Sequence, residues 1–276
     1  GLFGNEGSWY QTDLERAAFP LGVTIERLDF RELACHVGSQ GIQFFCGERS
    51  LEDFDAFIVR TMPPGSLEEV VTRMDFLGRL HAAGKRVINS PRAVECAVDK
   101  SLTSMRLAEQ GLPVPPTWVG ESSDAAMLAF EKLGGDVVVK PVFGAEGRGI
   151  LRLSDPDLAF RTFRTIERLD AVIYQQQFIA HPGFDTRILV LNGEVLGAMQ
   201  RHSDHDFRTN VSRQATATAC AITDEQRQLA LSACEIIGTT IAGVDLLCDE
   251  QNQHYVIELN AVPGWRAFQK ATGVDV

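Results

Sequence analysis

The stretch GVDLLCDEQNQHYVIELNAVPG, residues 243–264, guides how the rest of the chain is interpreted. It contains two apolar runs, Val244–Cys248 and Tyr255–Leu259, and the polar residues between them are typical of a turn. This pattern predicts two antiparallel strands joined near residues 251–252. A β-hairpin of this kind fixes where the polar side chains of one strand lie relative to those of the other.

Three polar side chains of the predicted hairpin can meet on one face. Glu258 and Asn260 are two positions apart on one strand and therefore point the same way. With the turn placed as above, Asp245 lies roughly opposite Glu258. Oxygen ligands held on two rigid strands suit Mg²⁺, which completes its shell with water and phosphate oxygens. A surface hairpin with solvated acids is the alternative that this stretch alone leaves open.

The composition is that of a globular protein and excludes several classes. The chain has 276 residues, of which 45% are hydrophobic and 23% charged. Its net charge of -11 argues against a nucleic-acid-binding surface. No apolar run is long enough to span a bilayer, and no signal-peptide pattern opens the chain. Because the chain starts without Met and ends on TGVDV, we expect trimmed ends and no closing helix.

The cysteines bear on the cellular compartment. Six are scattered along the chain without a CxxC pair. This usage indicates reduced, mostly buried thiols rather than disulfides or a zinc site. We therefore expect a cytoplasmic protein that binds neither membranes nor nucleic acids.

The order of strand and helix patterns predicts three parts. Residues 1–90 alternate strand and helix, which predicts a parallel α/β sheet. A central lobe follows at 91–174, and a strand-rich lobe with one helix occupies 175–276. In parallel sheets ligands gather beyond the carboxyl ends of the strands. The residues expected at those ends, as substrate contacts or simply as turns and caps, are Gly4–Ser8, Arg60 and Asn89.

The segment VVVKPVFGAEGRGI, residues 137–150, is the second informative stretch. An apolar strand ends in Lys140, and the loop that follows contains Gly144, Gly147 and Gly149. Free N–H groups of a glycine loop can cradle a phosphate, and a lysine adds a point charge. The lysine precedes the glycines and no helix follows directly, so this is not a Walker A loop. A tight hairpin would need similar glycines, which is the structural alternative.

A third polar cluster follows the central lobe. Asp185-Thr186-Arg187 opens a predicted hairpin around Asn192-Gly193, and a polar segment comes after it. The cationic and amide side chains of that region suit an anion, with a solvated loop as the alternative; they are Arg201, Arg208, Asn210 and Arg213.

Taken in order, these motifs resemble the ATP-grasp superfamily, and within it the RimK-type α-L-glutamate ligases. The resemblance spans roughly residues 85–276 and rests on Asp99-Lys100, VVVKPVFGAEGRGI, QQFI, DTR, FRTN, GVDLL and VIELNAVPG. It implies an α/β (α+β) ATP-grasp fold, in which a parallel α/β pre-ATP-grasp domain precedes two lobes that grip ATP. It also implies a homo-oligomer.

The resemblance assigns roles to the nucleotide-binding residues. Lys100 and Lys140 would contact phosphates, with the glycine loop as a lid over them. Gln177 and Phe178 would meet the adenine through backbone groups. Asp185 would lie near the ribose. The family commonly has an acidic residue where this chain has Gln177.

The resemblance also assigns the reacting centre. Arg208 and Asn210 would lie near the phosphates and the reacting carboxylate. Arg208 and Arg213 would stabilise the tetrahedral oxyanion or the leaving phosphate. The three hairpin oxygen ligands would bind Mg²⁺ or Mn²⁺. After FRTN the family commonly shows Arg-Gly-Gly where this chain has Arg213-Gln214-Ala215.

The activity that follows is ATP-dependent ligation of a carboxylate to an amine through an acylphosphate. Its partners would be ATP, a carboxylate acceptor and an amino-acid donor such as glutamate. The acceptor would be a protein tail or a small cofactor. A different ATP-grasp enzyme, for example a kinase or a ligase of another specificity, and a nucleotide-binding module without catalysis are the alternatives.

Overall fold

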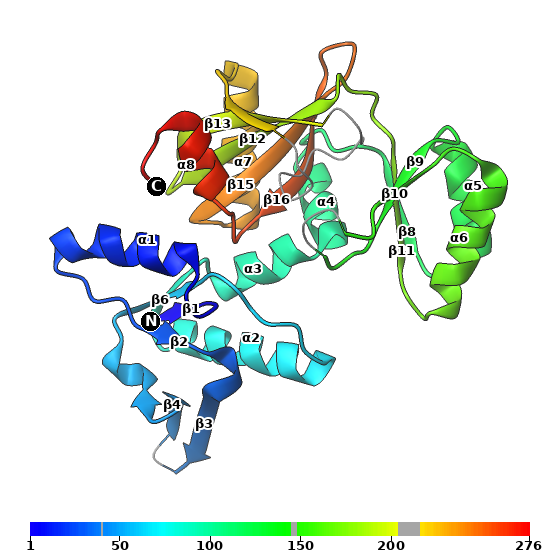
Figure 1. Ribbon diagram of the computed structural model, residues 1–276. Coiled ribbons are helices and arrows are strands. Elements are labelled where there is room, and N and C mark those ends of the chain that lie inside the picture. The colour runs from blue at the N-terminus through cyan, green and yellow to red at the C-terminus, as the bar shows by residue number, and fades with distance from the viewer. Residues whose placement is uncertain (40, 145–147, 204–215) are drawn as a thin grey trace. The chain divides into compact units, whose positions relative to one another are not determined.

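The computed structural model describes residues 1–39, 41–144, 148–203 and 216–276. The chain forms two compact units (Figure 1). Unit 1 comprises residues 1–95 with 238–241, and unit 2 comprises residues 96–237 with 242–276. No helix in the described ranges combines the length and apolar character needed to cross a bilayer. The mixed α/β class predicted from the sequence is confirmed.

Unit 1 contains a parallel sheet of order β2–β1–β6–β7. Its strands are β1 (Leu2–Phe3), β2 (Arg27–Leu28), β6 (Ala56–Val59) and β7 (Arg86–Ile88). Its helices are α1 (Trp9–Ala18), α2 (Leu67–Ala82) and most of α3 (Pro91–Val98), with 3-10 turns at Phe19–Leu21, Phe30–Glu32 and Leu51–Asp53. Stacked rings of Phe3 and Phe57 lie at the centre of its core.

The predicted parallel sheet for residues 1–90 is only part of this region. Between β2 and β6 the chain forms a separate antiparallel sheet of β3 (Leu33–Gly38), β4 (Gly41–Cys46) and β5 (Arg49–Ser50). The inner ends of these strands bury Phe44 and Cys46, whereas most of β3 is exposed. Because these strands are weakly buried, their sequence shows little of the hydrophobic alternation from which an antiparallel sheet could be predicted.

The residues at the carboxyl ends of the parallel strands have structural partners. Ser8 caps α1 through a hydrogen bond from the Gln11 N–H at 3.2 Å. The Asn89 side chain, 1% exposed, accepts from Thr240 N at 2.6 Å and donates to the Ile241 carbonyl at 2.7 Å. Ser8 is therefore a helix cap, whereas Asn89 joins the end of β7 to the backbone of residues 240–241.

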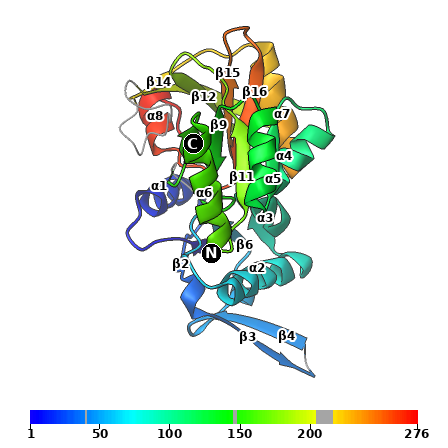
Figure 2. The same ribbon diagram turned by 90° about the vertical axis from the view of Figure 1, so that its right-hand side faces the viewer.

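Unit 2 begins with an antiparallel sheet of order β10–β9–β11–β8. Its strands are β8 (Thr117–Gly120), β9 (Val137–Lys140), β10 (Leu151–Leu153) and β11 (Ile173–Gln177). Helices α5 (Ser123–Lys132) and α6 (Pro156–Arg168) lie side by side on this sheet (Figure 2). Phe130 and Phe163 are buried beneath them against the strands.

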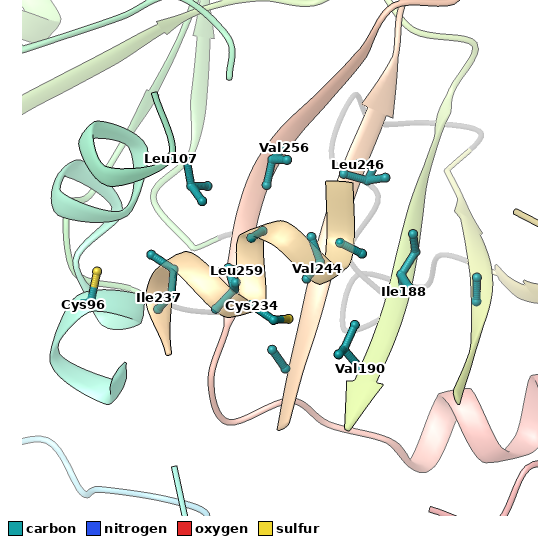
Figure 3. Packing of buried hydrophobic residues seen from close by; sticks show 14 residues of the cluster. Cys96, Leu107, Ile188, Val190, Cys234, Ile237, Val244, Leu246, Val256 and Leu259 are labelled. Atoms are coloured by element: carbon teal, nitrogen blue, oxygen red, sulfur yellow. The ribbon is translucent and has the colours of Figure 1, made fainter. Parts of the chain in front are cut away.

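The second sheet of unit 2 has the order β14–β13–β12–β15–β16. Its strands are β12 (Phe184–Leu191), β13 (Glu194–His202), β14 (Thr216–Ala219), β15 (Ile241–Cys248) and β16 (His254–Asn260), and its helices are α4 (Lys100–Glu109) and α7 (Asp224–Ile237). Leu107 of α4 and Ile237 of α7 join residues of four strands, β12, β13, β15 and β16, in one hydrophobic cluster (Figure 3). The predicted boundary at 174/175 falls within β11, and the three-part division stays a prediction.

The opening hairpin has the predicted register. Strands β15 and β16 are antiparallel, with Asp245 opposite Glu258 and Gly243 opposite Asn260. The turn contains Asn252 at a positive φ of 63°. The two acidic residues therefore lie on neighbouring positions of adjacent strands, as the sequence predicted.

The expectation of no closing helix was wrong. Helix α8 (Arg266–Thr272) packs against β13 and β14 and ends at Gly273, whose φ is 74°. Trp265 and Phe268 are 3% and 1% exposed. The burial of these two aromatic side chains stabilises a helix too short to be recognised by hydrophobic periodicity.

Candidate active site

A pocket that opens to solvent lies within unit 2; the empty space between its walls is about 870 Å³, open solvent included. Its walls come from α4, the sheet that contains β9 and β11, and the sheet that contains β12 to β16. The structure places most of the described predicted site residues on this pocket, namely Lys100, Lys140, Gly144, Gln177, Phe178, Asp185, Asp245 and Glu258.

Two lysine ammonium groups face this pocket from different elements. Lys140 is the last residue of β9, and its Nζ donates to Gln176 Oε1 at 2.8 Å. Lys100 is the first residue of α4, and its Nζ donates to the Gly144 carbonyl at 2.7 Å. The same Lys100 Nζ lies 3.8 Å from Glu258 Oε1. Two cations at one end of a pocket provide a site for a polyanion.

The ammonium group of Lys140 is electrostatically perturbed. Burial lowers its pKa to about 8, with Lys100 acting in the same direction and Glu258 in the opposite one. A bound polyphosphate would favour the charged form and raise this pKa again. Binding of a polyanion should therefore be linked to the protonation of Lys140.

We expect ATP affinity to fall as the pH rises above about 8, because the free protein then loses the Lys140 charge. Binding must restore that proton, so the dissociation constant of a non-hydrolysable ATP analogue should rise about tenfold per pH unit there. Calorimetric titrations between about pH 7.5 and pH 9.5 measure this. Lys140→Arg should remove the dependence, because arginine stays charged. A wild-type affinity that is flat over this range would contradict the role of Lys140.

The glycine loop is described in part. Gly149 has a φ of 73°, and a Cβ there would lie 2.9 Å from Pro141 Cγ, so a side chain is excluded on both grounds. Of the other two predicted loop glycines, Gly144 lines the pocket and Gly147 lies outside the described residues. So do the three predicted catalytic residues Arg208, Asn210 and Arg213. Their roles stay predictions.

The last residue of β11 and the residue after it are fixed by backbone hydrogen bonds to neighbouring segments. Gln177 N donates to the Pro116 carbonyl at 2.8 Å, and Phe178 N donates to the Asp136 carbonyl at 2.9 Å. Backbone contacts from these two residues to an adenine would therefore use their carbonyl oxygens. The Arg152 guanidinium lies 3.5 Å from the centre of the Phe178 ring and gives that side chain a fixed cationic neighbour.

A buried network of two aspartates and two arginines forms another part of the pocket. Arg187 binds both carboxylate oxygens of Asp245, through Nε at 2.7 Å and Nη2 at 2.6 Å. Arg201 Nη2 donates to Asp245 at 2.7 Å, and the same guanidinium binds both oxygens of Asp185. Asp185 and Asp245 are each 1% exposed. Both carboxylate oxygens of Asp185, the predicted ribose contact, thus accept hydrogen bonds from Arg201.

Burial and the neighbouring charges shift the pKa values of this network in opposite directions. Burial acts to raise the pKa of Asp245, but Arg187 and Arg201 outweigh it and hold that pKa below its usual value. At Asp185 burial raises the pKa despite Arg201. Burial also acts to lower the pKa of Arg201, yet the two carboxylates raise it above its usual value. Arg201 therefore stays charged.

Two of the three predicted metal ligands, Asp245 and Glu258, lie on this pocket, and the metal-binding role of the set stays a prediction. Glu258 is half-buried at the pocket and lies opposite Asp245. Within the described ranges Oδ1 of Asp245 accepts one hydrogen bond, from Arg187, which leaves it capacity for another ligand. Asn260 is not on the pocket lining, and its Oδ1 accepts from Val262 N at 2.9 Å. No cluster of three His, Cys, Asp or Glu residues within the described ranges could hold a metal alone.

Several pocket residues were not singled out from the sequence as site residues. Gln176 and Arg148 line the pocket, as does Arg201, which the sequence suggested only as part of an anion-binding cluster. Arg187 was noted only in the motif DTR. Strand alternation could have found Arg187, because it shares a face of β12 with the predicted site residue Asp185. Nothing in the sequence shows which cross-strand partner each arginine takes.

Comparisons with known proteins support the same reading of the pocket. Residues 97–276 match the family model of the RimK-like ATP-grasp domain. The tetrahydromethanopterin:α-L-glutamate ligase of Methanosarcina acetivorans is 38% identical over 84% of this chain and 80% of its own length. The ribosomal protein bS6–L-glutamate ligase of Escherichia coli O139:H28 is 29% identical over 100% of this chain and 91% of its own length.

A solved structure agrees in fold. The ATP-grasp ligase PsnB, complexed with a phosphomimetic variant of its minimal precursor, Mg and ADP, superposes with a TM-score of 0.77 at 24% identity. The match covers 100% of this chain and 94% of PsnB. With the lysine pair and the carboxylate hairpin on one pocket, these matches show that the chain belongs to the RimK-like ATP-grasp family and is an ATP-dependent carboxylate–amine ligase.

Proposed function

We propose that the protein adds glutamate, or a similar amino acid, to the carboxylate of a small cofactor, with a protein tail as the other acceptor type. The observation that carries the ligase chemistry is the placement of Lys100 and Lys140 on the same pocket as Asp245 and Glu258. The relative that is 38% identical is named for a glutamate ligase acting on a pterin cofactor, which favours a small acceptor.

The chemistry requires that the acceptor carboxylate be activated. An amine cannot displace oxide from a carboxylate at a useful rate. Transfer of the γ-phosphoryl group of ATP to the carboxylate creates an acylphosphate, whose leaving group is phosphate. Positioning and neutralisation of charge supply most of the catalysis of phosphoryl transfer. Lys100 and Lys140 would bind the phosphates, and the glycine loop would exclude water from the acylphosphate.

The hairpin residues would hold a divalent cation. Glu258, Asp245 and Asn260 are the proposed oxygen ligands, and the bound ion, Mg²⁺ or Mn²⁺, would neutralise phosphate charge. Attack of the neutral amine on the acylphosphate then gives an amide and inorganic phosphate. Arg208 and Arg213 are proposed to stabilise the oxyanion of that step.

A screen for ADP release tests the proposed substrates. The protein is incubated with ATP and Mg²⁺, with glutamate or other amino acids, and with reduced pterins, related cofactor acids or acidic peptides. We expect ADP release that requires both an acid and an amino acid, and a product heavier than the acid by one amino-acyl residue. A stable phosphoester would instead indicate a kinase. ADP release that occurs with acidic peptides but not with the cofactor acids would indicate that the acceptor is a protein tail and not a small cofactor.

Two further proposals concern the protein in the cell. All six cysteines are free thiols, which fits a reducing compartment such as the cytoplasm. We also propose a homo-oligomer. Sedimentation at micromolar concentration would check this, and a single species with the mass of one 30.4 kDa chain would contradict it.

A further inference from the structure

A buried chain of hydrogen bonds leads away from Lys140. Its Nζ donates to Gln176 Oε1 at 2.8 Å. Gln176 Nε2 donates to the Thr117 hydroxyl at 2.9 Å and to the Tyr174 hydroxyl at 3.1 Å. The Tyr174 hydroxyl is in turn 2.9 Å from Ser104 Oγ. Gln176 and Tyr174 are 3% and 1% exposed, so water does not replace these contacts.

This path of hydrogen bonds joins β9, which carries Lys140, to α4, which carries Lys100. Lys140 on β9 lies opposite Tyr174 on β11 in the sheet register. Tyr174 and Gln176 are two positions apart and share a face of β11. Ser104 lies four residues after Lys100 on α4, so both point from the same side of that helix. The path Lys140–Gln176–Tyr174–Ser104 therefore fixes β9 relative to the helix that starts with Lys100.

The partner of Lys140 is neutral and can adopt only one orientation. The Gln176 amide nitrogen donates to two hydroxyl groups, so its oxygen is left to accept from Lys140. A flipped amide would place its NH₂ group against the ammonium group, donor to donor. A carboxylate at this position would form an ion pair and neutralise part of the charge offered to a phosphate. Glutamine orients Lys140 and leaves its positive charge available to a phosphate.

We propose that Gln176 is the positioning residue for Lys140, and that Tyr174 and Ser104 extend this brace to α4 so that both lysines are held for the phosphates. The inference rests on the proposed contact of the two lysines with the ATP phosphates. It predicts a phosphate-specific effect: altering the brace weakens binding of nucleotides through their phosphates and leaves the nucleoside part unaffected.

The experiment compares the affinities of adenosine, ADP and a non-hydrolysable ATP analogue by calorimetry. Gln176→Glu is expected to weaken ADP and analogue binding about tenfold while adenosine affinity stays within about twofold. Tyr174→Phe removes only the hydroxyl and is expected to cost about fivefold for ADP, again with adenosine unchanged. If the buried glutamate of Gln176→Glu prevents folding, Tyr174→Phe still tests the proposal.

Tyr255→Phe is the matched control. It removes a hydroxyl that bonds to Asp249 at 3.3 Å, in the β15–β16 turn and away from the pocket lining. It should change none of the three affinities. Losses of equal size for adenosine and ADP in the Tyr174 and Gln176 variants would show a general packing role and overturn the proposal.

Lys140→Ala separates this inference from the proposed function. If that variant binds ADP as tightly as the wild type, the proposed phosphate contact of Lys140 fails. If Lys140→Ala weakens ADP binding, then Tyr174→Phe combined with it should add little, because residues acting through one contact are not additive and the phenylalanine introduces no new charge. A full additional loss in the double variant would overturn the positioning role while leaving the phosphate contact in place.

Discussion

Replacement of Glu258 by glutamine is expected to lower kcat by about 100- to 1,000-fold, the range seen when one preorganised electrostatic group is removed from an active site. The change keeps the size of the side chain but removes the charge that would balance the cation and the phosphates. Glu258 is half-buried, with 31% of its side chain exposed, so the fold should tolerate the substitution. Steady-state ADP release measures kcat, and calorimetry with adenosine checks the nucleoside part of the pocket.

Glu250→Gln is the matched control for this substitution. Glu250 is exposed in the turn of the same hairpin and is absent from the pocket lining. Its replacement should leave kcat within about twofold, since surface substitutions away from special features have small effects. Turnover of Glu258→Gln at the wild-type rate would show that the hairpin carboxylates do not serve the reaction.

Arg201→Met should have the largest effect on stability. The methionine fills much of the space but leaves Asp185 without the guanidinium that binds both its oxygens. Breaking a buried ion pair by removing one partner costs about 3–5 kcal/mol, because the other charge stays buried. Denaturant unfolding should show this loss in the free energy of unfolding. A loss below about 1 kcal/mol would mean that the network is solvated.

Arg152→Met provides the comparison at the surface. Arg152 also binds both oxygens of one aspartate, Asp136, at 2.9 and 2.6 Å. The two side chains are 40% and 35% exposed, so water screens the pair. Its removal should cost about 0.2–1 kcal/mol. The difference between the two variants reports the effect of burial together with the second carboxylate, Asp245, that Arg201 binds and the Phe178 ring that Arg152 contacts.

Local sequence patterns predicted the parts of the site that depend on short-range rules. Alternating apolar residues and a polar turn gave the β15–β16 hairpin with Asp245 opposite Glu258. Asn192-Gly193 marked the turn between β12 and β13, and both residues have positive φ.

Long-range partners could not be predicted in this way. The contacts of Arg201 with Asp185 and Asp245 link three strands, and the contact of Tyr174 with Ser104 crosses 70 residues of sequence. Such pairings depend on sheet order and strand register, which a single sequence does not specify. The sequence consequently indicated most of the charged residues of the pocket and Gly144, but neither Arg148 nor Gln176, the neutral side chain that holds Lys140.

The most direct test of the proposed reaction follows one oxygen atom. The acceptor found in the ADP-release screen is labelled with oxygen-18 in its carboxylate and converted to product with ATP and the amino acid. Attack of the carboxylate on the γ-phosphorus predicts ADP as the nucleotide product and one labelled oxygen in each inorganic phosphate released. Unlabelled phosphate, or release of AMP and pyrophosphate, would contradict activation through an acylphosphate.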